Sequence, residues 1–113
     1  MHEYSVVQAL LEQIENIAEE NKASKVTKIV VKIGVMSGVE PHLLEIAFNA
    51  FKEKTICDGA EFVMNIQPIT IHCNKCNKTS ELKKIHYCCQ NCESIDIDVV
   101  DGEDMFLMNL EML

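Results

Sequence analysis

The segment Lys28-Ile29-Val30-Val31-Lys32-Ile33-Gly34-Val35 decides the fold of this chain. Apolar residues occupy positions 29, 31, 33 and 35, and lysines stand between them at 28 and 32. This period of two is typical of a strand with one buried face and one solvated face. We therefore expect a strand here whose odd-numbered residues lie in the core.

Amphipathic helices are predicted on both sides of this strand. The first is expected to begin at Ser5, where Gln8 completes a capping box that satisfies free N–H groups, and to end near Asn21. The second is expected to begin at Pro41, because proline suits the first turn of a helix, and to end before the turn at 58–59. Apolar residues recur at helical spacing in both, namely Val7, Leu10, Ile14 and Ile17, then Leu44, Ala47, Phe48 and Phe51.

The later strands are less regular. Even positions are apolar from Phe62 to Ile66, whereas beyond Pro68 the odd positions Ile69 and Ile71 are apolar. We interpret this change of parity as a bulge or an edge position in one strand that leads to residue 73. Residues 95–99 alternate again, and a last strand is predicted to place four residues on one side, Phe106, Met108, Leu110 and Met112.

Four cysteines form two pairs with metal-ligand spacing, Cys73 with Cys76 and Cys89 with Cys92. A tight turn directs both sulfurs of a pair to one point, and four thiolates complete a zinc tetrahedron without an open position. We therefore expect a structural zinc ion, whose binding stabilises a segment too small for its own core. A rubredoxin-like iron site uses the same ligands and remains an alternative.

Other residues near these pairs are possible competitors for the metal. Cys88 adjoins Cys89 and is spaced to compete with it, although the spacing of Cys89 mirrors that of the first pair. His72 and His86 flank the pairs and are interpreted as surface groups or partners of the ligands, with a Cys-to-His exchange left open. Cys57 is expected to be a buried, inert thiol.

The composition limits the classes of function. The chain has 113 residues, the size of one domain, with 10 basic and 18 acidic residues and a formal net charge of -8. This balance argues against nucleic acid and anionic membranes as partners, because phosphate binding depends on Lys and Arg. Residues 1–20 lack the uncharged apolar core of a signal peptide, and no apolar run is long enough to span a bilayer. We therefore expect a cytoplasmic protein with thiols rather than disulfides.

The first three residues, Met1, His2 and Glu3, form a potential chelator. The α-amine, the amide nitrogen of His2 and its imidazole can reach one metal ion in two small, nearly planar rings. A planar set of nitrogens suits Ni(II) or Cu(II). Glu3 or a carboxylate from elsewhere would add a ligand, and Glu40 and His42 are candidates for proximity. The same three residues also fit a frayed, solvated terminus.

Several segments in order carry a family resemblance. They are Met1-His2-Glu3-Tyr4-Ser5, the strand at 28–34, Phe48 and Phe51, the two cysteine pairs, and Met-Asn-Leu-Glu-Met at 108–112. Together they resemble the HypA/HybF family of hydrogenase maturation factors, which are nickel metallochaperones. The chain departs from many relatives at Gln90 and Glu93, where those relatives have proline and glycine, and at Cys88.

The resemblance implies a fold and a division of the chain. The fold is α+β, with two helices packed on a small three-stranded sheet and an inserted zinc-knuckle hairpin module. Residues 1–72 plus 95–113 would form the nickel-binding domain, and residues 73–94 the zinc-binding module. It also implies that Zn2+ is structural and bound by Cys73, Cys76, Cys89 and Cys92, whereas Ni2+ is cargo bound by Met1, His2, Glu3 and Glu40.

The resemblance further implies a carrier rather than an enzyme. Family members insert nickel into the precursor of the large subunit of NiFe hydrogenase and work with a GTPase, HypB. A homodimer and urease as a second client remain open. The chief alternative is a zinc-ribbon module for nucleic acid or protein, favoured by four lysines between the cysteines, Lys75, Lys78, Lys83 and Lys84. A zinc enzyme needs an open coordination position, which four sulfurs deny.

Overall fold

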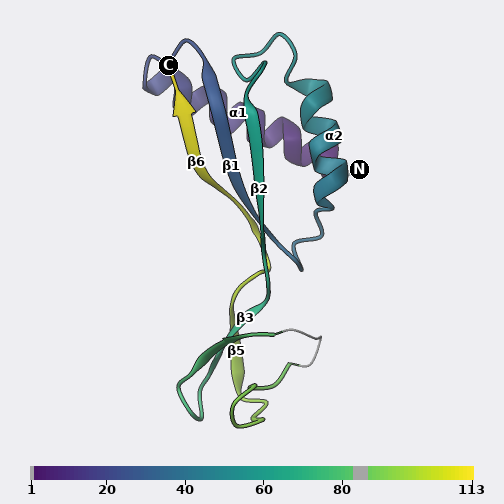
Figure 1. Ribbon diagram of the computed structural model, residues 1–113, viewed down its shortest axis with the longest axis vertical. Helices are drawn as coiled ribbons and strands as arrows, with labels where there is room; N and C mark the ends of the chain where they lie inside the picture. The colour runs from purple at the N-terminus through teal and green to yellow at the C-terminus, as the bar shows by residue number, and fades with distance from the viewer. Residues whose placement is uncertain (1, 83–86) are drawn as a thin grey trace.

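The computed structural model describes residues 2–82 and 87–113, with the backbone alone described for His2. Its elements are α1 (His2–Glu20), β1 (Val26–Gly34), α2 (Pro41–Phe51), β2 (Glu61–Gln67), β3 (Thr70–Cys73), β4 (Thr79–Glu81), β5 (Ile97–Asp101) and β6 (Met105–Met112). These strands form an upper sheet of order β2-β1-β6 and a lower sheet of order β4-β3-β5. The molecule is elongated, 52 × 28 × 17 Å, and both helices lie beside the upper sheet (Figure 1).

The strand β1 is the middle of the upper sheet, and its alternation is as predicted up to Ile33. Val35, which we also expected in the core, lies in a turn beyond the end of β1 and is 52% exposed. Ile29, Val31 and Ile33 are buried, whereas Lys28 and Lys32 are half-buried on the other face. β2 runs parallel to β1, and β6 runs antiparallel to it. A parallel neighbour requires a crossover connection, which α2 supplies. The central strand therefore organises all of the upper part of the molecule.

Both helices cover the same face of the upper sheet. Cys57 and Ala60, which precede β2, are buried in this core. Its other buried residues come from three elements, Val7, Leu10, Leu11, Ile14 and Ala18 of α1, Leu44, Ala47 and Phe48 of α2, and Val26, Ile29, Val31 and Ile33 of β1. Phe48 also stacks on Phe62 of β2, with ring centroids 4.2 Å apart. The expectation of two helices packed on a three-stranded sheet is confirmed.

The helix α1 begins earlier than the sequence predicted. Its first residue is His2 rather than Ser5, so the expected capping box lies inside the helix. The extra turn makes tertiary contacts, because the Tyr4 ring packs edge-on against Phe51 at a centroid distance of 5.4 Å. Such a contact between distant residues leaves no signal in the local sequence. The other end agrees with the prediction, since α1 ends at Glu20.

The change of parity at Pro68 marks a change of sheet, not the bulge or edge position that we predicted. β2 ends at Gln67 in the upper sheet, and β3 begins at Thr70 in the lower sheet. Proline has no N–H to donate to a ladder, so it suits a gap between two sheets. The one strand expected to lead to Cys73 is therefore two strands.

The last strand, β6, presents a different face from the one predicted. Phe106 and Met108 were expected to share a side with Leu110 and Met112, but they are 47% and 54% exposed. Leu110 and Met112 instead pack against the core together with Met105 and Leu107. The cause is one extra residue in β6, because Val30 pairs with Asn109 and Val31 with Leu107. Met108 between them reverses the parity of the strand.

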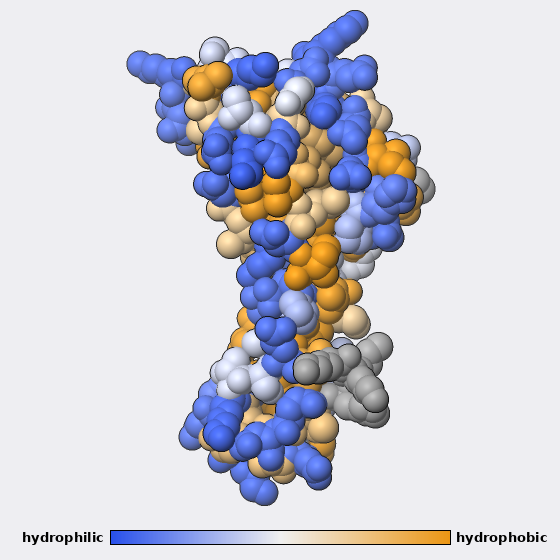
Figure 2. Space-filling model, viewed as in Figure 1, coloured by the Kyte–Doolittle hydropathy of each residue, from blue (hydrophilic) through white to orange (hydrophobic). Residues whose placement is uncertain are grey.

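The two sheets meet at a joint formed by Gly34, Pro68 and Gly102, where the molecule narrows (Figure 2). A Cβ at Gly34 would overlap the carbonyl of Gly102, and one at Gly102 would lie 2.6 Å from the carbonyl oxygen of Pro68. Gly102 also has φ +100°, which favours glycine. The backbone at this joint is therefore packed too closely for any side chain.

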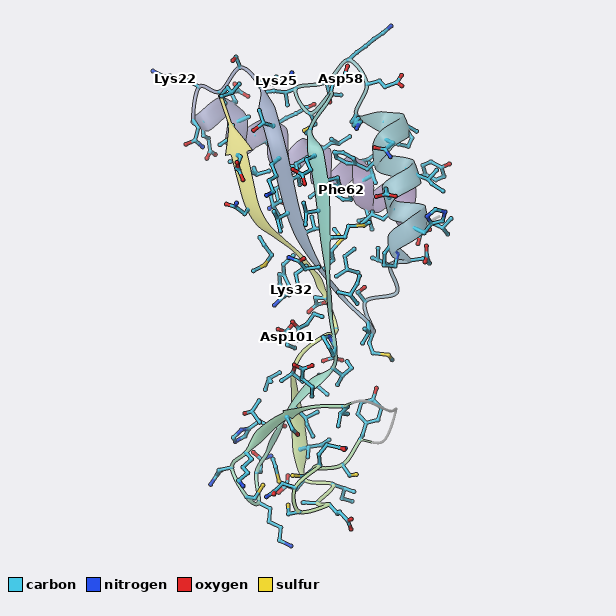
Figure 3. All side chains as sticks on the ribbon, in the orientation of Figure 1. Lys22, Lys25, Lys32, Asp58, Phe62 and Asp101 are labelled. Atoms are coloured by element: carbon cyan, nitrogen blue, oxygen red, sulfur yellow. The ribbon has the colours of Figure 1, made fainter. Side chains whose placement is uncertain are left out.

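An ion pair closes one side of the joint. Lys32 Nζ donates to Asp101 Oδ2 at 2.8 Å, and the two side chains face each other (Figure 3). The backbone N–H of Gly102 donates to the other carboxylate oxygen of Asp101 at 2.8 Å. The hydrogen bond from Lys32, followed by that from Gly102, holds the pKa of Asp101 below its usual value. Asp101 therefore links β1 of the upper sheet to the end of β5 in the lower sheet.

Replacing Gly102 tests the close packing at the joint. We expect Gly102→Ala to lower the free energy of unfolding by about 2–4 kcal/mol, because it adds both a left-handed backbone penalty and an overpacked contact. Gly38→Ala is the control, since Gly38 has φ +80° but no atom within 4 Å of its added Cβ. It should cost only about 1 kcal/mol. Urea unfolding of the zinc-loaded proteins gives the free energies of unfolding. Equal losses of this free energy in Gly102→Ala and Gly38→Ala would contradict the close packing at the joint.

Candidate metal centres

The structure brings four cysteine sulfurs together at the end of the lower sheet. Those of Cys73, Cys76, Cys89 and Cys92 all lie within 4.8 Å of one another. The Sγ atoms of Cys73 and Cys92 are 3.5 Å apart, and those of Cys76 and Cys89 are 3.6 Å apart. Four sulfurs at about 2.3 Å from a central zinc ion would be about 3.8 Å apart. The donor set and its spacing therefore fit a tetrahedral metal ion such as zinc.

The two cysteine pairs have the same local geometry. The backbone N–H of Asn77 donates to the carbonyl of Cys73 at 2.9 Å, and that of Glu93 donates to the carbonyl of Cys89 at 2.9 Å. Asn77 and Glu93 both have left-handed backbones, with φ of +59° and +63°. Each turn thus reverses the chain directly after its second cysteine, and Glu93 stands where the backbone conformation favours glycine.

Backbone N–H groups surround the sulfurs of both turns. Cys76 N–H donates to Cys73 Sγ at 3.4 Å, and Cys89 Sγ accepts from Asn91 and Cys92 at 3.3 and 3.4 Å. Such donors stabilise the thiolate, which is the form that binds a metal. This equivalence makes Cys89 the counterpart of Cys73. Cys88 is not a member of the cluster, although it directly precedes Cys89.

The thiol pKa values differ across the cluster. The backbone N–H of Cys92 is the main cause that lowers the pKa of Cys89 to about 6. At Cys92 the backbone N–H of Ser94 lowers the pKa, but burial and the three neighbouring thiols raise it to about 11. Four sulfurs this close cannot all be ionised without a compensating cation, because like charges oppose ionisation. A bound divalent ion would supply that charge.

The lower sheet has little apolar core to stabilise it. Within the described residues its buried cluster comprises only Ile69, Ile71 and Leu82, with Ile97 and Val99 partly buried against them. A core of this size contributes too little to fold a three-stranded sheet without a further restraint. The four-cysteine cluster lies in the same segment and provides the site for that restraint.

Glu3 and Glu40, both proposed for nickel, lie in contact at the starts of α1 and α2. Glu3 Oε2 accepts from the backbone N–H of Glu40 at 3.5 Å. Glu40 is the N-cap of α2, and its own Oε2 accepts from the N–H of Leu43 at 2.7 Å. Capping therefore accounts for the position of the Glu40 side chain without a metal.

Other residues named from the sequence are placed as follows. His42 is exposed in α2, and Nδ1 of His72 lies 3.3 Å from the hydroxyl of Thr79. Cys57 is fully buried as predicted, and burial followed by the charge of Glu15 raises its pKa to about 11. Met1, Lys83, Lys84 and His86 lie outside the described residues, and no side chain is described for His2.

Comparison with known proteins identifies the family. The family model described as "Hydrogenase/urease nickel incorporation, metallochaperone, hypA" matches residues 1–112. The chain belongs to the HypA family. The four-cysteine cluster and the two-helix α+β fold described above are thus found in a HypA-family protein. In residues 2–82 and 87–113, no helix is long and apolar enough to cross a membrane.

Individual relatives cover nearly the whole chain. The "Hydrogenase maturation factor HypA" of Aquifex aeolicus is 52% identical over 112 residues, which are 99% of this chain and 97% of that protein. The "Hydrogenase maturation factor HypA" of Shewanella sp. (strain MR-7) is 53% identical over 112 residues, which are 99% of this chain and 95% of that protein.

Solved structures agree with the family assignment. The solution structure of the Ni metallochaperone HypA from Helicobacter pylori has a TM-score of 0.72 at 31% identity, with 98% of this chain and 97% of that chain covered. A further solution structure of a HypA protein has a TM-score of 0.76 at 33% identity, with 100% and 97% covered. The arrangement of elements described above is therefore shared by HypA structures.

Single serine substitutions test which cysteine of the adjacent pair belongs to the metal centre. We expect Cys88→Ser to retain zinc, because its sulfur is outside the cluster, and Cys89→Ser to lose most of it, because a tetrahedral site loses one donor. Zinc content is measured by elemental analysis after dialysis against a weak chelator. Full zinc retention in Cys89→Ser together with loss in Cys88→Ser would contradict the arrangement described here.

The left-handed backbone at Glu93 gives a second prediction. Glu93→Gly should raise the free energy of unfolding of the zinc-loaded protein by about 1 kcal/mol, because glycine adopts positive φ without a Cβ clash. Asn77→Gly is the matched control in the other turn and should have a smaller effect, since asparagine tolerates this conformation. Thermal unfolding measures the stability of both variants. A loss of stability in Glu93→Gly would contradict a backbone cost of the left-handed conformation at Glu93.

Proposed function

We propose that this HypA-family chain is a nickel metallochaperone that binds Ni(II) at its N-terminus and delivers it for NiFe hydrogenase maturation. Zinc in the four-cysteine cluster has a structural role in this proposal. Family membership supports the nickel role. The observation that supports the location is the contact between the Glu3 carboxylate in the first turn of α1 and the backbone N–H of Glu40 at the start of α2, which brings two acidic residues together at the beginning of α1.

The start of α1 has the chemistry that such a site requires. His2 is the first residue of the helix, and the first four N–H groups of a helix have no acceptor within it. The amide of His2 can therefore lose its proton to a metal without breaking a helical hydrogen bond. The helix dipole also favours negative charge and disfavours the protonated α-amine at this end. Together with the imidazole of His2, these nitrogens form the planar set that suits Ni(II).

The carboxylates have supporting roles of different kinds. Glu3 is in the first turn of α1 and is half-buried, so its oxygen is held near the terminus. Glu40 already caps α2 with its carboxylate, and we propose it as a weaker contributor because its backbone contacts Glu3. A site of this kind on the first residues of the chain allows a partner to compete for the ligands one at a time. Such stepwise release suits a carrier that performs no catalysis.

Partners and location follow from the same proposal. We propose a HypB-type GTPase and the precursor of the hydrogenase large subunit as partners, in line with the maturation role of the family. The net charge of -8 supports a protein that binds neither nucleic acid nor anionic membranes. All six cysteines are free thiols, which supports a reducing, cytoplasmic compartment. We also propose a division into a nickel-binding domain (1–72 plus 95–113) and a zinc-binding module (73–94), in which β3 and β5 of the lower sheet connect the two parts.

Changing the N-terminus tests the nickel site directly. Adding one residue before Met1, or making His2→Ala, should abolish tight nickel binding while zinc content is unchanged, because each removes a nitrogen donor from the ring system. Nickel affinity should also fall as pH falls, because protons compete for the imidazole and the amine. His72→Ala, in the lower sheet, is the control. Isothermal titration of tag-free protein gives the affinities, and unaltered binding in His2→Ala would overturn the site.

A further substitution separates the two roles of Glu40. Glu40→Asn keeps a good helix N-cap but removes the negative charge. If the carboxylate contributes to nickel binding, the nickel affinity of Glu40→Asn should fall about tenfold with little change in thermal stability. Glu45→Gln, on the same helix, is the charge control. Wild-type nickel affinity in Glu40→Asn would reduce Glu40 to a capping residue.

A further inference from the structure

The strand β6 is an edge strand with a free side. The order of the upper sheet is β2-β1-β6, so β6 has a strand neighbour only at β1 within the described residues (Figure 1). An edge strand directs alternate N–H and C=O groups away from its neighbour, where they can pair with another chain. β6 is eight residues long, with the sequence MFLMNLEM. It contains no proline and a single charge, so two of the features that usually protect an edge are missing, although its pairing with β1 is irregular at Met108.

A groove runs beside this free edge, between β6 and α1. One hollow of about 260 Å³ is lined by Val6, Ala9 and Gln13 of α1 and by Met105 and Leu107 of β6, among others. A second hollow of about 320 Å³ is lined by Ile17 and by residues 107–110 and 112. Leu107 lines both, so the two hollows adjoin along the length of β6. Positions 6, 9, 13 and 17 share one face of the helix.

We propose that β6 and this groove bind an extended, basic segment of another protein by strand addition. The free N–H and C=O groups of β6 would pair with the backbone of the segment, and alternate apolar side chains would enter the groove. This combination of backbone pairing and alternating pockets is specific for an extended chain. A helix would leave the edge groups of β6 unpaired.

The charges around the groove determine the kind of segment. Glu20 is exposed three residues after Ile17 on α1, and Glu111 and Asp104 are exposed on or next to β6. Glu111 Oε2 is 3.7 Å from Lys28 Nζ, which offsets part of the charge of Glu111. Because the whole chain also has a net charge of -8, lysine or arginine at the outward positions of the segment would be favoured.

The same charges disfavour a second copy of this chain as the occupant. Antiparallel self-pairing of two β6 strands with Leu107 of each copy opposite Met108 of the other would place Glu111 of one copy opposite Asp104 of the other. Like charges at such positions destabilise strand pairing. The proposal concerns the apolar edge alone and does not depend on nickel, so it is tested on zinc-loaded, nickel-free protein.

The probe is the acetylated and amidated peptide Lys-Val-Lys-Ile-Lys-Val-Lys, which combines alternating β-branched residues with positive charge. Its binding is measured by fluorescence anisotropy, and its position by hydrogen exchange of the protein with mass spectrometry. We expect the peptide to slow exchange in residues 105–112 and to leave residues 61–67 of the other edge strand, β2, unchanged. The same peptide with alternate amides N-methylated should not bind, because it cannot pair with an edge.

Two protein variants locate the binding surface. Met108→Lys places a charge in the groove at a residue that is 54% exposed, so the fold should be retained. Its affinity for the peptide should fall about tenfold or more, because it repels a basic segment and blocks an apolar hollow. Met36→Lys is the matched control at 49% exposure in a different region, and it should bind normally.

Several results would overturn this proposal. They are the absence of binding up to about 1 mM peptide, equal loss of affinity in both lysine variants, and exchange protection at β2 in place of β6. Equal or tighter binding of Glu-Val-Glu-Ile-Glu-Val-Glu would contradict the basic character of the segment. A concentration-dependent dimer in sedimentation equilibrium that Met108→Lys abolishes would assign the edge to a second copy instead.

Discussion

The convergence of four cysteine sulfurs on one point is the constraint on which the rest of this structure depends. The chain leaves the upper sheet at the end of β2 and returns to it as β6, after residues 68–82 and 87–104 have passed through the lower part. The lower part that these residues form has a small buried apolar core of Ile69, Ile71 and Leu82. Closing it through a metal ion restricts the loop and so favours the pairing of β6 with β1. The joint at Gly34 and Gly102, which admits no side chain, then holds the two sheets together.

Residue patterns predicted those parts of the fold that depend on local periodicity. The alternation in β1 and the apolar faces of α1 and α2 correctly predicted an upper part with two helices on a sheet. The errors arose where a contact with a distant strand decides the outcome. A bulge and a change of sheet produce the same change of parity in the sequence, so the pattern at Pro68 does not distinguish them. The exposure of Phe106 follows from a register shift in the pairing of β6 with β1. Likewise, the contact of Tyr4 with Phe51 extends α1 beyond its expected start.

The sites show the same division between local and distant signals. The spacing of the cysteines predicts the geometry of each pair, because the tight turn that brings two sulfurs together involves only neighbouring residues. The sequence offered Cys88 and Cys89 as rivals, and the symmetry of the two turns places Cys89 in the cluster. By contrast, Glu3 and Glu40 are 37 positions apart in the sequence, and they meet because the starts of α1 and α2 lie against each other. The capping role of Glu40 also becomes visible only when the start of α2 is known.

In the proposed function the chain binds two metals with different ligands, nickel at its first residues and zinc at four cysteines between positions 73 and 92. X-ray absorption of one sample loaded with both metals tests this most directly, because each metal reports its own donors. At the zinc edge we expect four sulfurs at about 2.3 Å. At the nickel edge we expect only nitrogen and oxygen donors in a planar arrangement, consistent with the α-amine, His2 and a carboxylate. Sulfur donors at nickel would place the cargo in the cysteine cluster and contradict the separation of the two sites.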